Sequence, residues 1–294
     1  MKMNKKLIAT SMSMILAFSL TGCVDQNANE GEYPNTKNAK IATTSTAIVE
    51  ICEKMDIDLV GVPESDIKQT PKRYEDATKI GMAMAPDMEI VSQLRPDWIL
   101  SPVTLISDLQ PKYEAAKLNY AFMNLKSTEG MFTSIKELGD LFHKEAEADV
   151  LVKEYEQTIN EFKERNKDKK SPKVLLLMGL PGSYVVATKN SYAGSLLELV
   201  GGENVYEDES AEFLNVNPED MLKKDPDMIL LTAHAMPDDV MAMFDEEFKT
   251  NDIWKHFDAV KNNQVHQLPP AYFGMSATFD YPKALKHLEG ILYE

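Results

Sequence analysis

Short apolar runs alternate with amphipathic stretches through the first third of the chain after residue 40. The apolar runs predict four short strands, at 40–44, 59–62, 98–100 and around 120–122. Helical patterns fall between them, most clearly at about 45–55 and 87–94. Such alternation is typical of a parallel sheet with helices on its faces. We therefore expect an α/β unit here.

The middle of the chain, from about 131 to 170, carries no strand pattern. Ile135, Leu138 and Phe142 recur at helical spacing, and charged residues then dominate up to Lys170. One long helix, or two in succession, fits this region. After Pro172 the apolar runs return at 173–178 and 184–187, followed by a helix at 191–200 that ends at two glycines. The pattern predicts α/β architecture, with two lobes around parallel-type sheets joined by one long linking helix.

An internal repeat supports two related halves. Glu89 is followed seven residues later by Pro96-Asp97 and the apolar run 98–100. Glu219 is followed seven residues later by Pro226-Asp227 and the run 228–230. Each unit is a short helix that begins with an acid, then a Pro-Asp turn and a buried strand. Pro-Asp turns are common, but the equal spacing favours one such unit in each lobe.

The N-terminal segment has the pattern of a secretory signal. Three lysines within residues 2–6 precede an apolar run at 7–20, which is too short for a stable membrane span. The following Leu20-Thr21-Gly22-Cys23 resembles the bacterial lipobox, which implies cleavage before Cys23 and lipidation of its thiol. Alternatively, Cys23 is incidental to an ordinary signal. A lipidated protein would be anchored at the outer face of the cell membrane, not span it.

These patterns divide the chain into five parts. We expect a lipoprotein signal at 1–22, a polar tether at 23–39, an N-terminal lobe at 40–143, a linking helix at 144–170 and a C-terminal lobe at 171–294.

Composition and motifs narrow the function. The formal net charge of −16 argues against a nucleic acid partner. Cys52, at helical spacing from Ile48 and Met55, is expected in the core. The five histidines form no spaced pair for a metal ion, and the sequence has no nucleophile elbow, phosphate-binding glycine loop or zinc-protease motif. We therefore expect a binding protein and not an enzyme. A surface protein with a purely structural role is a further alternative.

The two-lobe plan resembles the ABC-transporter binding proteins that carry siderophores, vitamin B12 and haem. The stretches 89–101 and 197–205 carry this likeness, which runs from about Lys40 to the C-terminus. More narrowly, the chain is similar to the haem-receptor lipoproteins of the iron-regulated surface determinant system of Gram-positive bacteria. The closer match rests on Pro71-x-Arg73-Tyr74, Ile80-Gly81-x-x-Met84-x-Pro86, Met178-Gly179-x-Pro181-Gly182-Ser183-Tyr184, His234-x-Met236-Pro237 and the stretch 251–263.

The narrower resemblance implies haem b as the transported ligand, with its iron held by Met84 and His234. Met82 lies two residues before Met84 and is an alternative ligand. Taken alone, most methionines and single histidines are structural. His234, however, follows a predicted strand, and open α/β sheets bind ligands beyond the carboxyl ends of their strands. A methionine and a histidine are a known axial pair for haem iron.

Haem carries two propionates, which an acidic protein must hold locally. The best candidates are Thr43, Thr44 and Ser45, at the start of the first helix, because helix N-termini bind anions. The alternative role of Thr44 and Ser45 is simple capping of that helix, and both roles can hold at once. The loop containing Ser65, Lys68 and Arg73 could add a cation. Tyr272, with its neighbour Phe273, could cover the ring or belong to the core.

Glu89 and Glu219 have a different implied role. In this class of binding proteins one glutamate on each lobe pairs with arginines of the membrane permease of an ABC importer, and charge pairs of this kind set register. The alternative is an acid that satisfies a helix dipole. The resemblance also implies upstream cell-wall haem-transfer proteins as donors and a monomeric receptor. A ferric siderophore is the alternative ligand.

Overall fold

The computed structural model describes residues 36–65, 69–207 and 210–293. The signal segment, Cys23 and Lys68 lie outside these ranges. Residues 36–38 were expected in the tether, but Thr36–Asn38 forms a 3-10 turn, η1, and the Thr36 hydroxyl lies 3.1 Å from Nε2 of His143. A search of the described ranges for a helix both long and apolar enough to cross a membrane found none.

The first sheet has five strands in the order β3-β2-β1-β6-β7, and every neighbouring pair is parallel. Its central strands are buried on both faces, as expected for parallel strands covered by helices. The strands are β1 (Ile41–Thr43), β2 (Leu59–Val62), β3 (Thr78–Lys79), β6 (Trp98–Pro102) and β7 (Asn119–Met123).

Three helices connect these strands. The predicted helix at 45–55 is α1, and its apolar residues Ile48, Ile51 and Cys52 are buried. Burial raises the pKa of the Cys52 thiol to about 12, so the expectation that Cys52 is core is confirmed. The helices and short turns are α1 (Thr46–Lys54), η2 (Lys72–Tyr74), α2 (Met88–Leu94), η3 (Val103–Leu105) and α3 (Ile106–Ala115).

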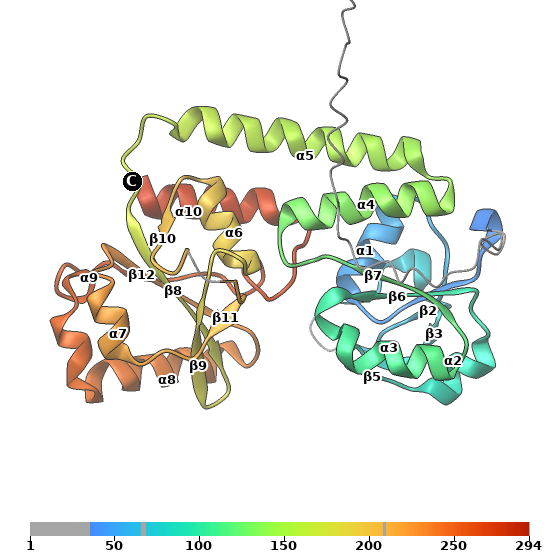
Figure 1. Ribbon diagram of the computed structural model, residues 1–294, viewed down its shortest axis with the longest axis horizontal. Coiled ribbons are helices and arrows are strands. Elements are labelled where there is room, and N and C mark those ends of the chain that lie inside the picture. Colours follow the sequence, from blue (N-terminus) through green and yellow to red (C-terminus); the bar gives the residue numbers. More distant parts are fainter. Residues whose placement is uncertain (1–35, 66–68, 208–209, 294) are drawn as a thin grey trace, which may run out of the picture. The chain divides into compact units, whose positions relative to one another are not determined.

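The middle of the chain forms two helices, which was one of the two predicted alternatives. α4 (Thr128–Phe142) begins at Ser127, whose hydroxyl accepts from the Gly130 N–H. It ends at His143, which adopts the left-handed conformation typical of a helix C-terminus. The chain then reverses into α5 (Glu145–Asn166), which packs along α4 (Figure 1).

The second sheet is mixed, whereas the sequence predicted parallel-type sheets. β8, β12 and β13 are parallel neighbours, and β10 pairs in parallel with β8. Pro181-Gly182 turns the chain back on itself, with Gly182 at φ +80, so that β9 pairs antiparallel with β8 and then with β11. The strands are β8 (Lys173–Leu180), β9 (Ser183–Ala187), β10 (Glu203–Asn204), β11 (Phe213–Leu214), β12 (Met228–Ala233) and β13 (Val265–Gln267).

In the second half, the one helix that the sequence analysis placed by its residues is confirmed. The helix expected at 191–200 begins after Ser191, whose hydroxyl accepts from Gly194 N–H, and ends before the two glycines. The elements are α6 (Tyr192–Leu199), α7 (Pro218–Lys223), α8 (Pro237–Thr250), η4 (Asp252–His256), α9 (Asp258–Lys261) and α10 (Tyr281–Tyr293).

An aromatic cluster ties elements of the two halves together around α5. Phe132 of α4 stacks on Tyr155 of α5 at 4.3 Å between ring centroids, and both rings contact Tyr281 of α10 edge-on. Lys126 and Glu212 add an ion pair of 2.8 Å between the halves. One continuous hydrophobic core therefore includes residues of both sheets and the connecting helices.

The two Pro-Asp units have the same hydrogen bonds. The Asp97 carboxylate accepts from the Lys40 N–H at 2.7 Å, and the Asp97 N–H donates to the Lys40 carbonyl at 2.7 Å. Asp227 makes the same two bonds with Lys173, each at 2.8 Å. Each aspartate thus connects the turn before one strand to the start of its neighbour. The predicted repeat of a short helix, a Pro-Asp turn and a buried strand is confirmed.

Candidate functional site

Met84 lies at the tip of a small hairpin beside the first sheet. β4 (Gly81–Met82) and β5 (Ala85–Pro86) pair antiparallel, so Ala83 and Met84 form the turn between them. Gly81 has φ +90, which a residue with a side chain rarely adopts. Met84 is 67% exposed and Met82 is 64% exposed. Both thioethers are therefore open to a ligand.

His234 directly follows β12, at the carboxyl end of that strand, as the sequence predicted. The backbone N–H of His234 donates to the Gly179 carbonyl at 3.0 Å, which connects this part of the backbone to β8. The side chain reaches the surface. Partial burial of the imidazole lowers its pKa below the usual value, which favours the neutral form of the ring. A neutral imidazole is the form that binds iron.

The described ranges contain few exposed large apolar residues. Apart from one on α5, they are Met84 itself or lie within two residues of Met84 or His234 in the sequence. The set consists of Met82, Met84, Val150 and Met236. Met236, two residues after His234, was noted in the sequence only as part of the resemblance. Its exposure is visible only in the folded structure, because its neighbours in sequence give no sign of it.

Thr43 and Thr44 are buried, and their hydroxyl groups bond within the protein. The Thr44 hydroxyl lies 2.8 Å from that of Ser101, which in turn lies 2.8 Å from the Tyr113 hydroxyl. The Thr43 hydroxyl accepts from the Ser45 N–H at 3.2 Å. Sequence reasoning missed Ser101 and Tyr113, since nothing in their spacing indicates a shared contact. The chain of hydroxyls fixes the connection between β1 and α1.

Ser45 is the N-cap residue of α1, yet its side chain makes no capping bond. The simple capping role considered for it is therefore wrong. Its side chain is 8% exposed, and no hydrogen bond to its hydroxyl occurs among the described residues. A hydroxyl donor and the positive end of a nine-residue helix dipole thus lie together at the end of β1.

The described part of the loop after β2 offers no unpaired arginine for an anionic ligand. Ser65 is exposed. Arg73, considered as a cation for an anionic ligand, is held by Asp56 and Asp58 at 2.5 and 2.7 Å. These two carboxylates raise the pKa of the guanidinium still further. Arg73 therefore has a structural role in this conformation, because its charge is already paired.

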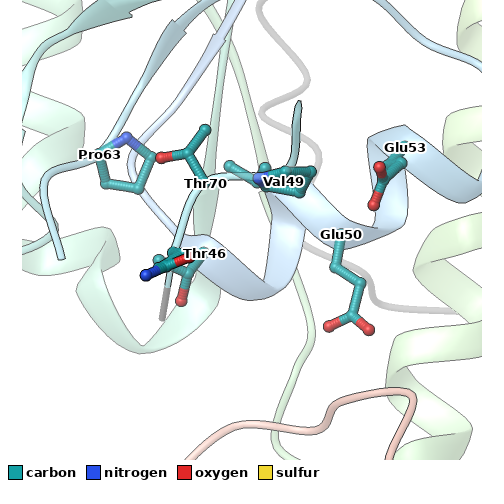
Figure 2. Close-up of a pocket in the computed structure, with 8 residues that line it drawn as sticks. Thr46, Val49, Glu50, Glu53, Pro63 and Thr70 are labelled. Carbon is teal, nitrogen blue, oxygen red and sulfur yellow. The ribbon is translucent and has the colours of Figure 1, made fainter. Parts of the chain in front are cut away.

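A small pocket lies along α1, close to the start of that helix. α1 supplies Thr46, Val49, Glu50 and Glu53, and Pro63 with residues 69–71 lines the other side (Figure 2). Its volume is about 100 Å³, whereas small-molecule sites typically measure about 300–1,000 Å³. This pocket is too small for a macrocycle.

Tyr272 and Phe273 lie beside the end of β12. The Thr232 hydroxyl, two residues before His234, donates to the Phe273 carbonyl at 2.9 Å. Phe273 is fully buried and is core, whereas Tyr272 is half-buried and has the Lys283 ammonium 5.7 Å from its ring centroid. The structure thus separates the two aromatic rings, and Tyr272 remains available to a ligand.

Glu89 and Glu219 occupy equivalent positions in the two repeats. Each is the second residue of its helix, after the N-cap residues Asp87 and Asn217. In both helices the N-cap side chain accepts the free backbone N–H groups. Both glutamates are exposed. The cap already satisfies these N–H groups, so neither glutamate is needed as a hydrogen-bond acceptor there.

No cluster of three or more histidine, cysteine, aspartate or glutamate side chains suited to a metal ion occurs within the described ranges. The candidate site therefore consists of separate groups: an exposed thioether beside one sheet, an imidazole at the end of the other, and a donor-rich helix start.

Comparison with known proteins identifies the class. Residues 41–272 match the family described as periplasmic binding protein. The chain is 39% identical to the high-affinity heme uptake system protein IsdE of Staphylococcus aureus strain Newman, over 100% of this chain and 99% of that protein. Two sheets connected through the helices α4 and α5 fit this class of binding protein, and the chain belongs to the periplasmic binding protein family. Because the family consists of binding proteins, the chain is a binding protein and not an enzyme.

Solved structures give the same picture. An ABC transporter substrate-binding protein from Listeria monocytogenes EGD-e is 49% identical with a TM-score of 0.83, covering 87% of this chain and 99% of that one. S. aureus IsdE complexed with heme is 40% identical with a TM-score of 0.82 and the same coverage. The periplasmic vitamin B12 binding protein BtuF of Vibrio cholerae, at 16% identity and a TM-score of 0.69, shares the fold.

Proposed function

We propose that this protein is a haem receptor that captures haem between its two lobes and delivers it to the permease of an ABC importer. One observation carries the proposal: the thioether of Met84 in the first half and the imidazole of His234 in the second are both exposed and open to a ligand. The likeness to a heme uptake protein along the full chain supports haem as the ligand.

The iron would be held by Met84 and His234. A methionine and a histidine on opposite faces fill the coordination sphere of haem iron, which favours a state that does not activate oxygen. This suits a carrier, because reactivity of the cargo is unwanted. Met84 is preferred to Met82 because it lies in the turn of the hairpin, whereas Met82 is paired in β4 with Ala85.

The start of α1 would hold the propionates of haem b. Ser45 offers a free hydroxyl, and the helix end offers a positive dipole, so Ser45 is the strongest donor of the segment 43–45. Thr43 and Thr44 would act mainly by fixing the backbone, since their hydroxyls are engaged. Ser65, Lys68 and Tyr272 complete the proposed contacts. Lys68 would supply the cation that Arg73 cannot.

Glu89 and Glu219 would contact arginines of the permease, one on each lobe. Their equal place in the two repeats supports two-point docking, which a pair of similar membrane subunits requires. Each glutamate would steer the approach of the receptor and set its register. The hydrogen-bonded Pro-Asp turns behind them would keep this spacing fixed.

The receptor would work as a monomer outside the cytoplasm, anchored through a lipid on Cys23. A periplasmic family supports this location. Cell-wall haem-transfer proteins would be its donors. The net charge of −16 makes nucleic acid an unsuitable partner.

Titration of the purified protein with haem tests the proposal. We expect a one-to-one complex with a six-coordinate, low-spin absorption spectrum. The second candidate ligand is a ferric siderophore, which would quench protein fluorescence without a Soret shift. A protein that shows this quenching, and no Soret change with haem, would not be a haem receptor.

A further inference from the structure

Met236 has a backbone conformation that its place in the fold does not explain. Seven described residues other than glycine have positive φ, and six of them are the first or second residue after a helix: Asp56, Arg95, Lys117, His143, Asp225 and Asn263. A left-handed residue after a helix is an ordinary C-terminal arrangement. Met236, at φ 45 and ψ 59, instead begins a helix.

The residue type is equally unusual at this position. Met236 is the N-cap of α8, where asparagine, aspartate, serine or threonine would accept a free N–H group. Its side chain makes no such bond. It also precedes Pro237, and the residue before a proline is sterically restricted. A left-handed methionine is therefore less stable here than an asparagine would be, since asparagine tolerates this conformation.

The same arrangement directs a large apolar side chain into solvent. Met236 is 55% exposed, whereas most methionines of the two sheets are buried. It lies two residues after His234, just beyond the carboxyl end of β12. Unfavourable backbone conformations that persist in a folded protein tend to mark functional sites.

We propose that Met236 is a ligand-contact residue whose thioether packs against the porphyrin ring on the side of His234 without binding the iron. The inference rests on the proposed function. A flexible side chain with a polarisable sulfur suits a broad aromatic ring. On the other half, Met82 and Met84 present exposed side chains of the same chemistry.

The test is the variant Met236→Asn, which should distinguish a role in contacting haem from a role in stabilising the fold. Asparagine tolerates the left-handed backbone better than methionine, so the haem-free protein should unfold about 2–4 °C higher. Haem transfer to apomyoglobin should nevertheless become about threefold to tenfold faster, because the apolar contact is lost. The six-coordinate spectrum should not change. Met236→Leu, which keeps the apolar contact, should release haem at nearly the wild-type rate.

Val150→Asn is the matched control, because Val150 is also an exposed apolar residue, 57% exposed, but lies on α5. It should leave haem release unchanged. The inference fails if wild-type protein binds haem but Met236→Asn releases it at the wild-type rate, or if Met236→Asn loses the six-coordinate spectrum. Wild-type protein that binds no haem would instead refute the proposed function.

Discussion

The two halves of the molecule are alike in their framework and unlike in their proposed ligand residues. The Pro-Asp units match to the level of individual hydrogen bonds, with Asp97 and Asp227 each bonded twice to a lysine backbone. By contrast, Met84 lies on a two-stranded hairpin outside the main sheet, whereas His234 directly follows a central strand. The two halves therefore repeat each other at the Pro-Asp units but not at the proposed ligand residues.

This difference fits the two partners proposed for the protein. A framework that repeats, with one exposed glutamate on each copy, suits a partner that itself has two similar subunits. Haem, by contrast, takes a different axial ligand on each face in the proposed complex, so its two contact regions need not match. The local supports differ accordingly: Met84 lies in a turn between two strands of two residues each, while β12 is paired on both sides.

Replacing His234 should have the largest effect, because it removes the proposed ligand that follows a strand paired on both sides. His234→Ala should abolish the six-coordinate spectrum and speed haem release at least about tenfold, since even outer-shell partners of a metal ligand cost about 10–100-fold. Absorption spectra and haem transfer to apomyoglobin measure both. His256→Ala, at an exposed histidine in η4, is the control and should change neither. An unchanged spectrum in His234→Ala would exclude it as a ligand.

Replacing the methionines of the β4–β5 hairpin should affect haem release less than replacing His234, but it should show which methionine binds the iron. Met84→Ala should convert the spectrum to a five-coordinate, high-spin form and raise the release rate less than His234→Ala, because histidine would still hold the iron. Met82→Ala should keep the six-coordinate form. If instead Met82→Ala changes coordination and Met84→Ala does not, the ligand is the strand residue and the turn only supports it.

The framework could be predicted from the sequence because it depends on local chemistry. Apolar runs, the two glycines after α6 and the equal spacing of glutamate and Pro-Asp all have direct structural meaning. The antiparallel β9 was missed, since a buried apolar run looks the same in either direction and only the turn at Pro181-Gly182 decides it.

The site could be predicted only in part. The position of His234 at a strand end followed from the pattern of the sequence. The engagement of Arg73 by two aspartates and the chain of hydroxyls from Thr44 to Tyr113 join segments that are distant in sequence. The spacing of residues along the sequence does not predict contacts between such distant segments. The free hydroxyl of Ser45 likewise became visible only in the folded structure.

Removing the repeated glutamates tests the framework side of the comparison. The double variant Glu89→Ala and Glu219→Ala should bind haem normally but support about tenfold slower uptake, which corresponds to about 1.4 kcal/mol over two charge pairs. Haem-dependent growth under iron limitation measures uptake. Glu129→Ala is the control, because Glu129 is also an exposed second residue of a helix but has no counterpart in a repeat. Uptake at the wild-type rate in the double variant would refute docking.

The smallest expected effect concerns the aspartates of the repeat. Asp97→Ala and Asp227→Ala each remove a carboxylate that accepts one backbone N–H, and each should lower the free energy of unfolding by about 1 kcal/mol. Urea unfolding measures the loss in each variant. Because both aspartates are exposed and make the same two bonds, the losses should be nearly equal, and haem coordination should stay intact. A loss confined to one of them would show that the two units, though alike in geometry, do not contribute equally to the stability of their sheets.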